Sequence, residues 1–333
     1  MSKRKLSDQQ TRRIQLIQAE RRRRAEKGDA HIDELIDHGQ LGPEEEGLLI
    51  TQFGTQADVE RQDGQIHRCR QRQHVGLLVA GDRVSWRPGP AHSGVIVARQ
   101  ERRSVLGRMD RHGDLKPIAA NVDQMIIVAA KEPALQTYLI DSYLVAAETL
   151  GMQAEICLNK SDLLTKQDPV YLQAQWYQAL GYHVVTASVT LQHGLDELSK
   201  SLRDKTSVFV GQSGVGKSSL IGAFIPEEEI RIGAISEQTL HGRHTTSNSR
   251  LYHLRQGGDL IDSPGIREFG LWHMAPRDIA RGFIEFRPFL DQCKFRDCAH
   301  EHEPSCALRE ALKTGAITAD RFKNFQQLCR ESD

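Results

Sequence analysis

Gly211-Gln-Ser-Gly-Val-Gly-Lys-Ser218 is the stretch that decides the fold of this chain of 333 residues. It matches the phosphate-loop pattern G-x-x-x-x-G-K-[ST], in which the glycines let consecutive backbone N–H groups turn inward around phosphates. Residues 206–210 before it predict a strand and residues 218–224 after it predict a helix, which is the context of a phosphate loop rather than of a plain turn. We expect nucleotide contacts from Gly211, Gln212, Ser213, Gly214, Val215, Gly216, Lys217, Ser218 and Ser219.

Two further motifs flank this loop in an unusual order. Asn159-Lys-Ser-Asp162 comes before it, and Asp262-Ser-Pro-Gly265 comes after it. Ordinary GTPases place the phosphate loop first and the base-reading tetrapeptide last. A rotated order requires the old termini to be joined and new ones opened elsewhere, which is tolerated where termini lie close together at a domain surface. Strands and helices alternate from about residue 113, so the sequence predicts a circularly permuted GTPase domain with a parallel α/β sheet.

The tetrapeptide after the predicted strand 154–158 points to guanine. Asp162 can accept both N–H donors on the guanine edge, which adenine does not supply, and Asn159 and Lys160 complete the motif. Ala187 and Ser188 end another predicted strand and suit a backbone loop that approaches the guanine oxygen. Each of these signals is weak alone, but together and in one permuted order they are strong.

Catalysis is less clear from the sequence. Asp262 ends a predicted strand, where it can hold Mg²⁺ through water, and Gly265 can offer its N–H to the γ-phosphate. Many GTPases place a water-orienting Gln directly after this motif, whereas here the residue is Ile266. Hydrolysis must therefore recruit another group.

The segment 240–246 lies where the first switch belongs. Thr245 and Thr246 are candidates to contact Mg²⁺ and the γ-phosphate, and the adjacent His244 can orient water. Lys217 would reach the β and γ oxygens, and Ser218 would ligate Mg²⁺. The alternative is that 240–246 is a solvated loop in which His244 has no role.

The C-terminal region gathers metal-ligand side chains. Cys293, Cys298, His300 and Cys306 place three thiolates and one imidazole within fourteen residues, a suitable set for one structural Zn²⁺. The alternatives are free buried thiols or, less favoured in a chain without a secretory signal, a disulfide. His302 is a poor rival ligand because the other four complete the shell. Three other cysteines are isolated in sequence and predict small apolar fillers: Cys69, Cys157 and Cys329.

The charge is unevenly distributed although Lys+Arg and Asp+Glu are equal at 44 each. Residues 1–28 carry ten Lys/Arg against three Asp/Glu, which predicts a flexible arm that binds nucleic-acid phosphates, the alternative being a solvated tail. Residues 51–112 are also basic. No apolar run approaches about 18 residues, so we expect no membrane span.

Five short strands within residues 45–112 predict a small barrel of the OB type. They are expected at 46–52, 57–60, 66–70, 82–86 and 94–98. Arginines in and after this segment could contact an RNA backbone: Arg68, Arg70, Arg72, Arg102, Arg103, Arg108 and Arg111.

These motifs resemble the bacterial small-subunit-dependent GTPase family RsgA, also called YjeQ. The resemblance rests on Gly242-Arg-His-Thr-Thr246, on Asp262-Ser-Pro-Gly-Ile-Arg-Glu-Phe-Gly270 and on the cysteine-rich tail. It spans nearly the whole chain and implies a maturation factor of the 30S subunit with an OB-fold domain and a subunit-activated GTPase. We expect four parts: a basic arm (1–44), the OB domain (45–112), the permuted GTPase domain (113–273) and a helical zinc domain (274–333).

With this resemblance, we expect a cytoplasmic, monomeric GTP hydrolase that binds the 30S subunit and its 16S rRNA and leaves after hydrolysis. An alternative is an RNA-binding scaffold in which GTP occupancy rather than turnover is the signal, which Ile266 favours. A third reading, an NTPase acting on DNA, is disfavoured by the guanine-reading Asn159 and Asp162.

Overall fold

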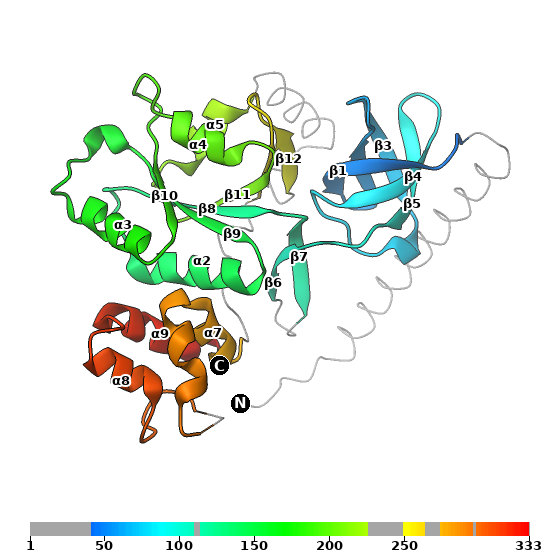
Figure 1. Cartoon of the computed structure of the whole chain (residues 1–333). Helices are drawn as coiled ribbons and strands as arrows, with labels where there is room; N and C mark the ends of the chain where they lie inside the picture. The colour runs from blue at the N-terminus through cyan, green and yellow to red at the C-terminus, as the bar shows by residue number, and fades with distance from the viewer. Residues whose placement is uncertain (1–40, 110–113, 226–248, 264–273, 296–297, 333) are drawn as a thin grey trace, which may run out of the picture. The chain divides into compact units, whose positions relative to one another are not determined.

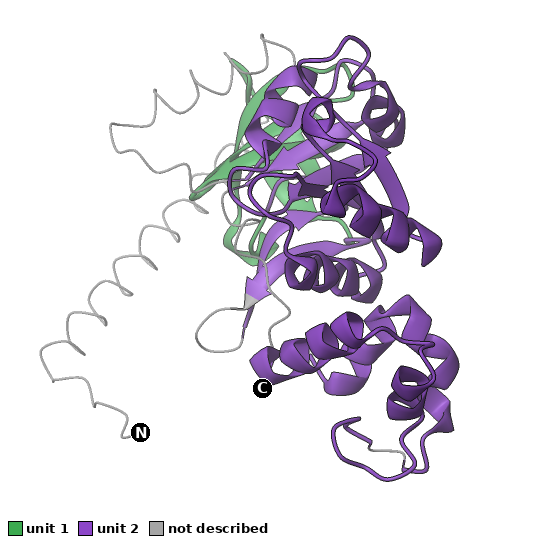
Figure 2. Cartoon of the chain, turned by 90° about the vertical axis from the view of Figure 1, so that its left-hand side faces the viewer, with its two compact units in different colours: residues 1–78, 82–101 green, residues 79–81, 102–333 purple. Residues whose placement is uncertain are grey.

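The computed structural model describes residues 41–109, 114–225, 249–263, 274–295 and 298–332. Contacts divide the chain into two compact units (Figure 2). Unit 1 contains residues up to 78 together with 82–101, and unit 2 contains residues 79–81 and 102–333. Among the described residues, no helix has both the length and the apolar character needed to cross a bilayer.

Unit 1 is a five-stranded barrel. Its strands are β1 (Glu45–Phe53), β2 (Gln56–Glu60), β3 (Ile66–Gln71), β4 (Arg83–Pro88) and β5 (Ser93–Arg99), and a short helix η1 (Gln73–Val75) follows β3. The strands pair in the order β1-β2-β3-β5-β4, and β4 pairs back to β1, which closes the barrel. The pair β3–β5 is parallel and the other pairs are antiparallel. The five strands predicted from the sequence are therefore confirmed, in an OB-like arrangement.

The barrel closes around alternating apolar side chains. Leu49, Val59, Cys69 and Trp86 are fully buried. Inward-facing residues in a strand recur at every second position, so the sequence alternation translates directly into this core. Cys69 fills space in it, as the sequence predicted.

Unit 2 contains a twisted α/β sheet (Figure 1). Its strand order is β10 (His183–Thr186), β9 (Gln153–Leu158), β8 (Gln124–Ala129), β11 (Thr206–Val210), β13 (Asp259–Asp262) and β12 (Arg250–His253). The first five are parallel, and β12 is antiparallel to β13. The associated helices are α2 (Thr137–Thr149), η2 (Ser161–Leu163), α3 (Pro169–Ala179), α4 (Asp196–Leu202) and α5 (Lys217–Phe224). The predicted strands and helices around all three nucleotide motifs are thus confirmed.

A second sheet and a helical region complete unit 2. The hairpin β6 (Val105–Met109) and β7 (Leu115–Ala120), which the sequence analysis did not anticipate, forms a separate two-stranded sheet. The C-terminal helices are α7 (Pro276–Gly282), η4 (Ile284–Gln292), α8 (Ala307–Lys313) and α9 (Ala319–Ser332). By contacts, residues 102–109 group with the sheet rather than with the barrel, and the C-terminal helices are not a separate unit. The four expected domain ranges remain a prediction.

Candidate functional site

The phosphate loop leaves the central strand β11 and enters α5. Gly211 and Gly216 have positive φ angles of 131° and 96°. A Cβ atom on Gly211 would lie 2.2 Å from the carbonyl oxygen of Val128, and one on Gly216 would lie 2.3 Å from Nδ2 of Asn159. Both positions therefore require glycine, for the backbone angle and for the close approach of a neighbour.

The Lys217 side chain is buried along this loop. Its Nζ donates hydrogen bonds to the carbonyl oxygens of Gly211 at 2.7 Å and Gln212 at 2.6 Å. Ser218 and Ser219 are exposed at the start of α5, while the Val215 side chain is in the apolar core of the sheet. The ammonium is held where it can meet an anion that binds at the helix N-terminus.

The base-reading motif lies directly beside the phosphate loop. The Asn159 amide donates from Nδ2 to the carbonyl oxygen of Val215 at 2.9 Å, and its buried Oδ1 has no hydrogen-bond partner among the described residues. Lys160 donates from Nζ to the carbonyl oxygens of Gly214 and Glu132, each at 3.0 Å. Two motifs that are about fifty residues apart in sequence thus form one site.

The Asp162 carboxylate is oriented by its neighbours. The Ser188 hydroxyl donates to Oδ1 of Asp162 at 2.5 Å, and this hydrogen bond is the main reason why the pKa of Asp162 is lowered. The backbone N–H of Ala187 donates to the Leu158 carbonyl oxygen at 2.9 Å. The Asp162 carboxylate is therefore ionised, as it must be to accept hydrogen bonds from two N–H donors. Sequence reasoning did not find Thr190, whose hydroxyl is 2.9 Å from that of Ser188.

Asp262 ends β13, beside the strand that carries the phosphate loop, and Ser263 after it is buried. Other predicted positions are outside the described residues: His244, Thr245, Thr246, Gly265 and Ile266.

The four predicted metal ligands converge. The ligand atoms of Cys293, Cys298, His300 and Cys306 all lie within 4.8 Å of one another. Nδ1 of His300 is 3.6 Å from Sγ of Cys293 and 3.4 Å from Sγ of Cys306. Tetrahedral zinc with S and N ligands at about 2.3 and 2.1 Å implies S···N separations of about 3.6 Å, so the residues present fit such an ion. The group could hold a metal ion.

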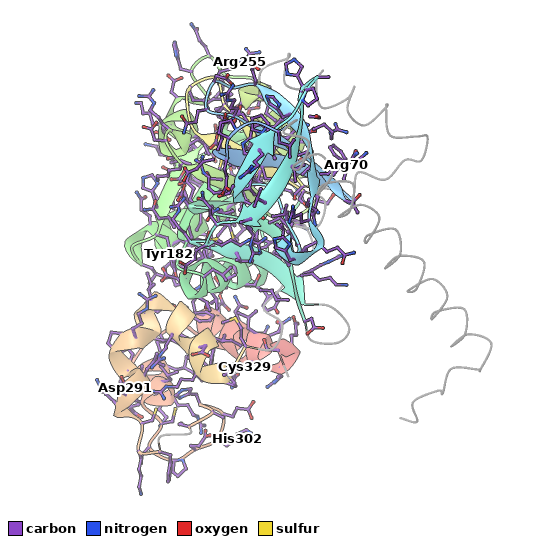
Figure 3. All side chains as sticks on the ribbon, turned by 90° about the vertical axis from the view of Figure 1, so that its right-hand side faces the viewer. Arg70, Tyr182, Arg255, Asp291, His302 and Cys329 are labelled. Carbon is purple, nitrogen blue, oxygen red and sulfur yellow. The ribbon has the colours of Figure 1, made fainter. Side chains whose placement is uncertain are left out.

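Burial also suits this cluster to a cation. It lowers the pKa of His300, which keeps the imidazole neutral, and it raises the pKa of Cys298 to about 12. Thiols with a raised pKa lose their protons when a metal compensates the charge. The His302 side chain is 92% exposed and is not part of the group (Figure 3). If no metal ion binds to the group, its three cysteines are free thiols.

A carboxylate that the sequence did not single out organises the ligand loop. Glu303 accepts hydrogen bonds from the backbone N–H groups of Ala299 at 2.8 Å, Glu301 at 3.0 Å and His302 at 3.1 Å. The backbone amide of Glu303 itself, followed by these three neighbouring amides, lowers the pKa of Glu303 to about 2. Glu303 lies between His300 and Cys306 in the sequence. This position was a usable signal, because one Glu carboxylate can accept hydrogen bonds from several backbone amides of a turn.

The arginines expected to contact RNA differ in availability. Arg68 forms an ion pair with Asp58 and stacks on Phe53, and Arg103 pairs with Asp123 at 2.9 Å. Arg70 is exposed on β3 (Figure 3). Arg108 is also exposed, and Arg111 is outside the described residues.

Comparisons with known proteins agree with this geometry. Residues 99–272 match the RsgA GTPase family. A protein of Hahella chejuensis named "Small ribosomal subunit biogenesis GTPase RsgA" is 51% identical over 338 residues, covering 100% of this chain and 97% of that protein. A protein of the same name from Chromohalobacter salexigens is 52% identical over 334 residues, covering 98% of each.

Two solved structures have the same architecture. The crystal structure of YjeQ from Thermotoga maritima has a TM-score of 0.71 and 30% identity, covering 87% of this chain and 98% of that one. YloQ, described as a circularly permuted GTPase, has a TM-score of 0.67 and 28% identity, covering 87% and 95%. On the match to the family model and on these full-length relatives, the chain belongs to the RsgA family of GTP-hydrolysing enzymes.

Proposed function

We propose that this protein hydrolyses GTP while bound to the small (30S) ribosomal subunit, assists late maturation of that subunit and is stimulated by it. The observation that carries the proposal is the contact of Asn159 and Lys160 with the phosphate loop, which brings the motif that ends at Asp162 and the phosphate loop into one site. This arrangement fits guanine and phosphates of one nucleotide. The relatives named as small ribosomal subunit biogenesis GTPases support the choice of partner.

The roles of individual residues follow from chemistry. Lys217 would exchange its two carbonyl acceptors for β and γ phosphate oxygens, and the loop amides would surround the phosphates. Ser218 and, through water, Asp262 would hold Mg²⁺, which neutralises charge that develops on the phosphates. Asp162 would accept from the guanine edge, with Ala187 and Ser188 near the guanine oxygen. Gly265, Thr245 and Thr246 would face the γ-phosphate, and His244 would orient water.

The metal at the cysteine cluster would be zinc. Three thiolates and one imidazole are the donor set that structural zinc prefers, and a closed shell of four leaves no position for catalysis. It would fix the loops before α8. We further propose that the arm (1–44), the OB domain (45–112) and the zinc domain (274–333) contact 16S rRNA or subunit proteins around the GTPase domain (113–273), and that the protein is a cytoplasmic monomer.

A scaffold controlled by GTP occupancy is the second candidate, because Ile266 takes the position of the usual water-orienting Gln. Multiple-turnover GTP hydrolysis, measured with and without 30S particles, separates the two. Turnover that rises with added particles supports the hydrolase. Nucleotide-dependent binding to the particles without turnover supports the scaffold.

A further inference from the structure

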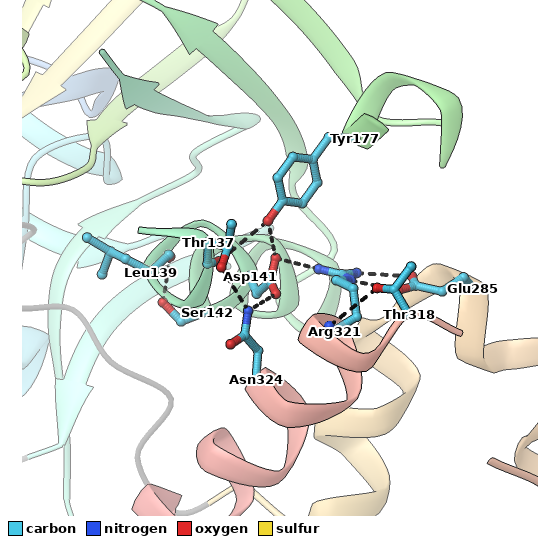
Figure 4. Close-up of polar contacts among 9 residues, drawn as sticks. All are labelled: Thr137, Leu139, Asp141, Ser142, Tyr177, Glu285, Thr318, Arg321 and Asn324. Carbon is cyan, nitrogen blue, oxygen red and sulfur yellow. Dashed lines mark hydrogen bonds and ion pairs between the residues drawn. The ribbon is translucent and has the colours of Figure 1, made fainter. Parts of the chain in front are cut away.

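Carboxylates that accept hydrogen bonds from hydroxyl groups differ in accessibility. Asp141 of α2 accepts from the Tyr177 hydroxyl at 2.5 Å, from Asn324 at 2.7 Å and from Arg321 at 2.6 Å, and its side chain is 0% exposed (Figure 4). Because this carboxylate is enclosed, it holds α9 against α2 and is not accessible to a ligand. An exposed carboxylate with the same kind of partner is instead available for recognition.

The Asp162 carboxylate is of the exposed kind. It accepts a hydrogen bond from the Ser188 hydroxyl at 2.5 Å. A carboxylate has about four lone-pair sites on its two oxygens, so this bond leaves a site on each oxygen for the two N–H donors of guanine. An exposed side chain otherwise changes rotamer freely, and the bond from Ser188 therefore restrains the direction of both oxygens.

Thr190 contacts the same Ser188 hydroxyl twice. Oγ1 of Thr190 lies 2.9 Å from Oγ of Ser188, and the Thr190 backbone N–H donates to that oxygen at 3.2 Å. An aspartate is ionised at neutral pH and can only accept, so the single proton of the Ser188 hydroxyl points to Asp162. The Thr190 hydroxyl must then be the donor in its contact with Ser188. Thr190, Ser188 and Asp162 thus form a hydroxyl relay whose direction follows from this count of protons.

The backbone of Ser188 is fixed on both sides. Its N–H donates to the Gly194 carbonyl oxygen at 2.8 Å, and the carbonyl oxygen of the preceding Ala187 accepts from the Ser161 N–H at 3.0 Å. Ser188 is also buried, with 1% of its surface exposed. The freedom that remains at Ser188 is the direction of its hydroxyl group, and the two bonds from Thr190 restrain it.

We propose that Thr190 is a positioning residue for guanine recognition, which orients the Ser188 hydroxyl and through it the Asp162 carboxylate. The inference rests on the nucleotide site proposed above. A carboxylate that is already oriented loses less conformational freedom when the base binds, so the hydroxyl relay increases affinity without touching the nucleotide. Its effect should be largest for a base that offers two N–H donors to Asp162.

Thr190→Val in the full-length protein removes the hydroxyl and keeps the β-branched shape and the backbone N–H. We expect the dissociation constant for GDP to rise about threefold to tenfold, the range for loss of one hydrogen bond. KM for GTP should rise while kcat changes little, because the base is bound alike before and during hydrolysis.

Base preference separates this role from a general effect on the fold. Inosine diphosphate lacks the exocyclic amino group of guanine, so it offers Asp162 one N–H donor instead of two. The preference for GDP over inosine diphosphate should therefore fall about threefold in Thr190→Val, within the range for one hydrogen bond. Displacement of a fluorescent GDP analogue by each diphosphate measures both affinities.

Thr165→Val is the matched control. The Thr165 hydroxyl is exposed like that of Thr190 and donates to a carboxylate outside the relay, that of Asp168, at 2.9 Å. This variant should keep the wild-type GDP affinity and base preference. Thr190→Ser restores the hydroxyl and should bind both diphosphates as wild type does. If Thr190→Val does not fold, judged by circular dichroism, Thr190→Ala takes its place.

Combining Thr190→Val with Ser188→Ala tests whether Thr190 acts through Ser188. We expect the double variant to bind GDP as Ser188→Ala alone does, because the hydroxyl relay is already broken. An additive loss of affinity, or a folded Thr190→Val with the wild-type preference for GDP, would overturn the proposed role of Thr190. Failure of the wild-type protein to bind GDP would instead overturn the nucleotide site itself.

Discussion

In the proposed site, the choice of guanine would depend on one carboxylate. Asp162 is held by the Ser188 hydroxyl, and its pKa is lowered, so it is an ionised acceptor at neutral pH. We expect Asp162→Asn to weaken GTP binding by about 2 to 4 kcal/mol, through loss of a charged bidentate partner, and to favour xanthosine triphosphate. Competition binding with both nucleotides measures this. Equal GTP affinity in variant and wild type would contradict the assignment.

At the cysteine cluster, one side chain outside the ligand set also matters. Glu303 holds three backbone amides of the loop between Cys298 and Cys306. We expect purified wild-type protein to contain about one zinc per chain, and Cys298→Ala to lose it. Glu303→Ala should keep the metal but release it to a chelator about tenfold faster, because outer-shell groups orient ligands. Wild-type protein that is folded and metal-free by elemental analysis would refute the zinc assignment.

Catalysis is also tested at single residues. Lys217→Ala should strongly reduce nucleotide binding or GTP turnover, because it removes the ammonium group beside the phosphate loop. His244→Ala should leave GTP binding near wild type and lower hydrolysis about 100-fold or more if the imidazole orients water. Steady-state kinetics with 30S particles provide the measurement. Undiminished turnover in His244→Ala would assign that residue to the solvated-loop alternative.

Among the secondary-structure elements, α3 has a pH-dependent contact at its N-terminus, where Asp168 directly precedes the helix. The Asp168 carboxylate pairs with Lys131 at 2.8 Å and accepts a hydrogen bond from the Thr165 amide at 2.6 Å, and Lys131, followed by Thr165, lowers the pKa of Asp168 to about 2. A depressed carboxyl pKa gives stability that is full above the unfolded value of 3.8 and is lost as pH falls towards 2. Asp168→Asn should therefore melt below wild type at pH 7, and the difference should vanish near pH 2. A difference that is independent of pH would assign the effect to packing.

At the scale of the whole molecule, the charge of the N-terminal arm and the bound nucleotide should control binding to the 30S subunit. Binding to 30S particles should be tighter with a non-hydrolysable GTP analogue than with GDP, because a ligand shifts an equilibrium only through its differential affinity. Deleting residues 1–28 removes ten Lys/Arg, so affinity should fall and its salt dependence should flatten. Co-sedimentation over a range of salt concentrations measures both effects. If GTP turnover does not change when 30S particles are added, and binding to the particles does not depend on the nucleotide, the protein would be a permuted GTPase of unknown partner.

The sequence by itself determined the permuted GTPase domain, the five barrel strands and the four residues of the Cys₃His cluster that could hold a metal ion. It could do so because phosphate loops, strand alternation and ligand spacing are local patterns: Gly211, Gly216 and Lys217 are specified within eight residues. The contacts between motifs needed the tertiary structure, because Asn159 follows β9 and Val215 lies after β11, and only the fold brings these distant segments of the chain together. Arg68 looked available for RNA in sequence, and only the fold brings Asp58 and Phe53 to it. Likewise the Asp141–Arg321 pair spans 180 residues and leaves no local signal, since a buried charge is recognised only when its partner is packed against it.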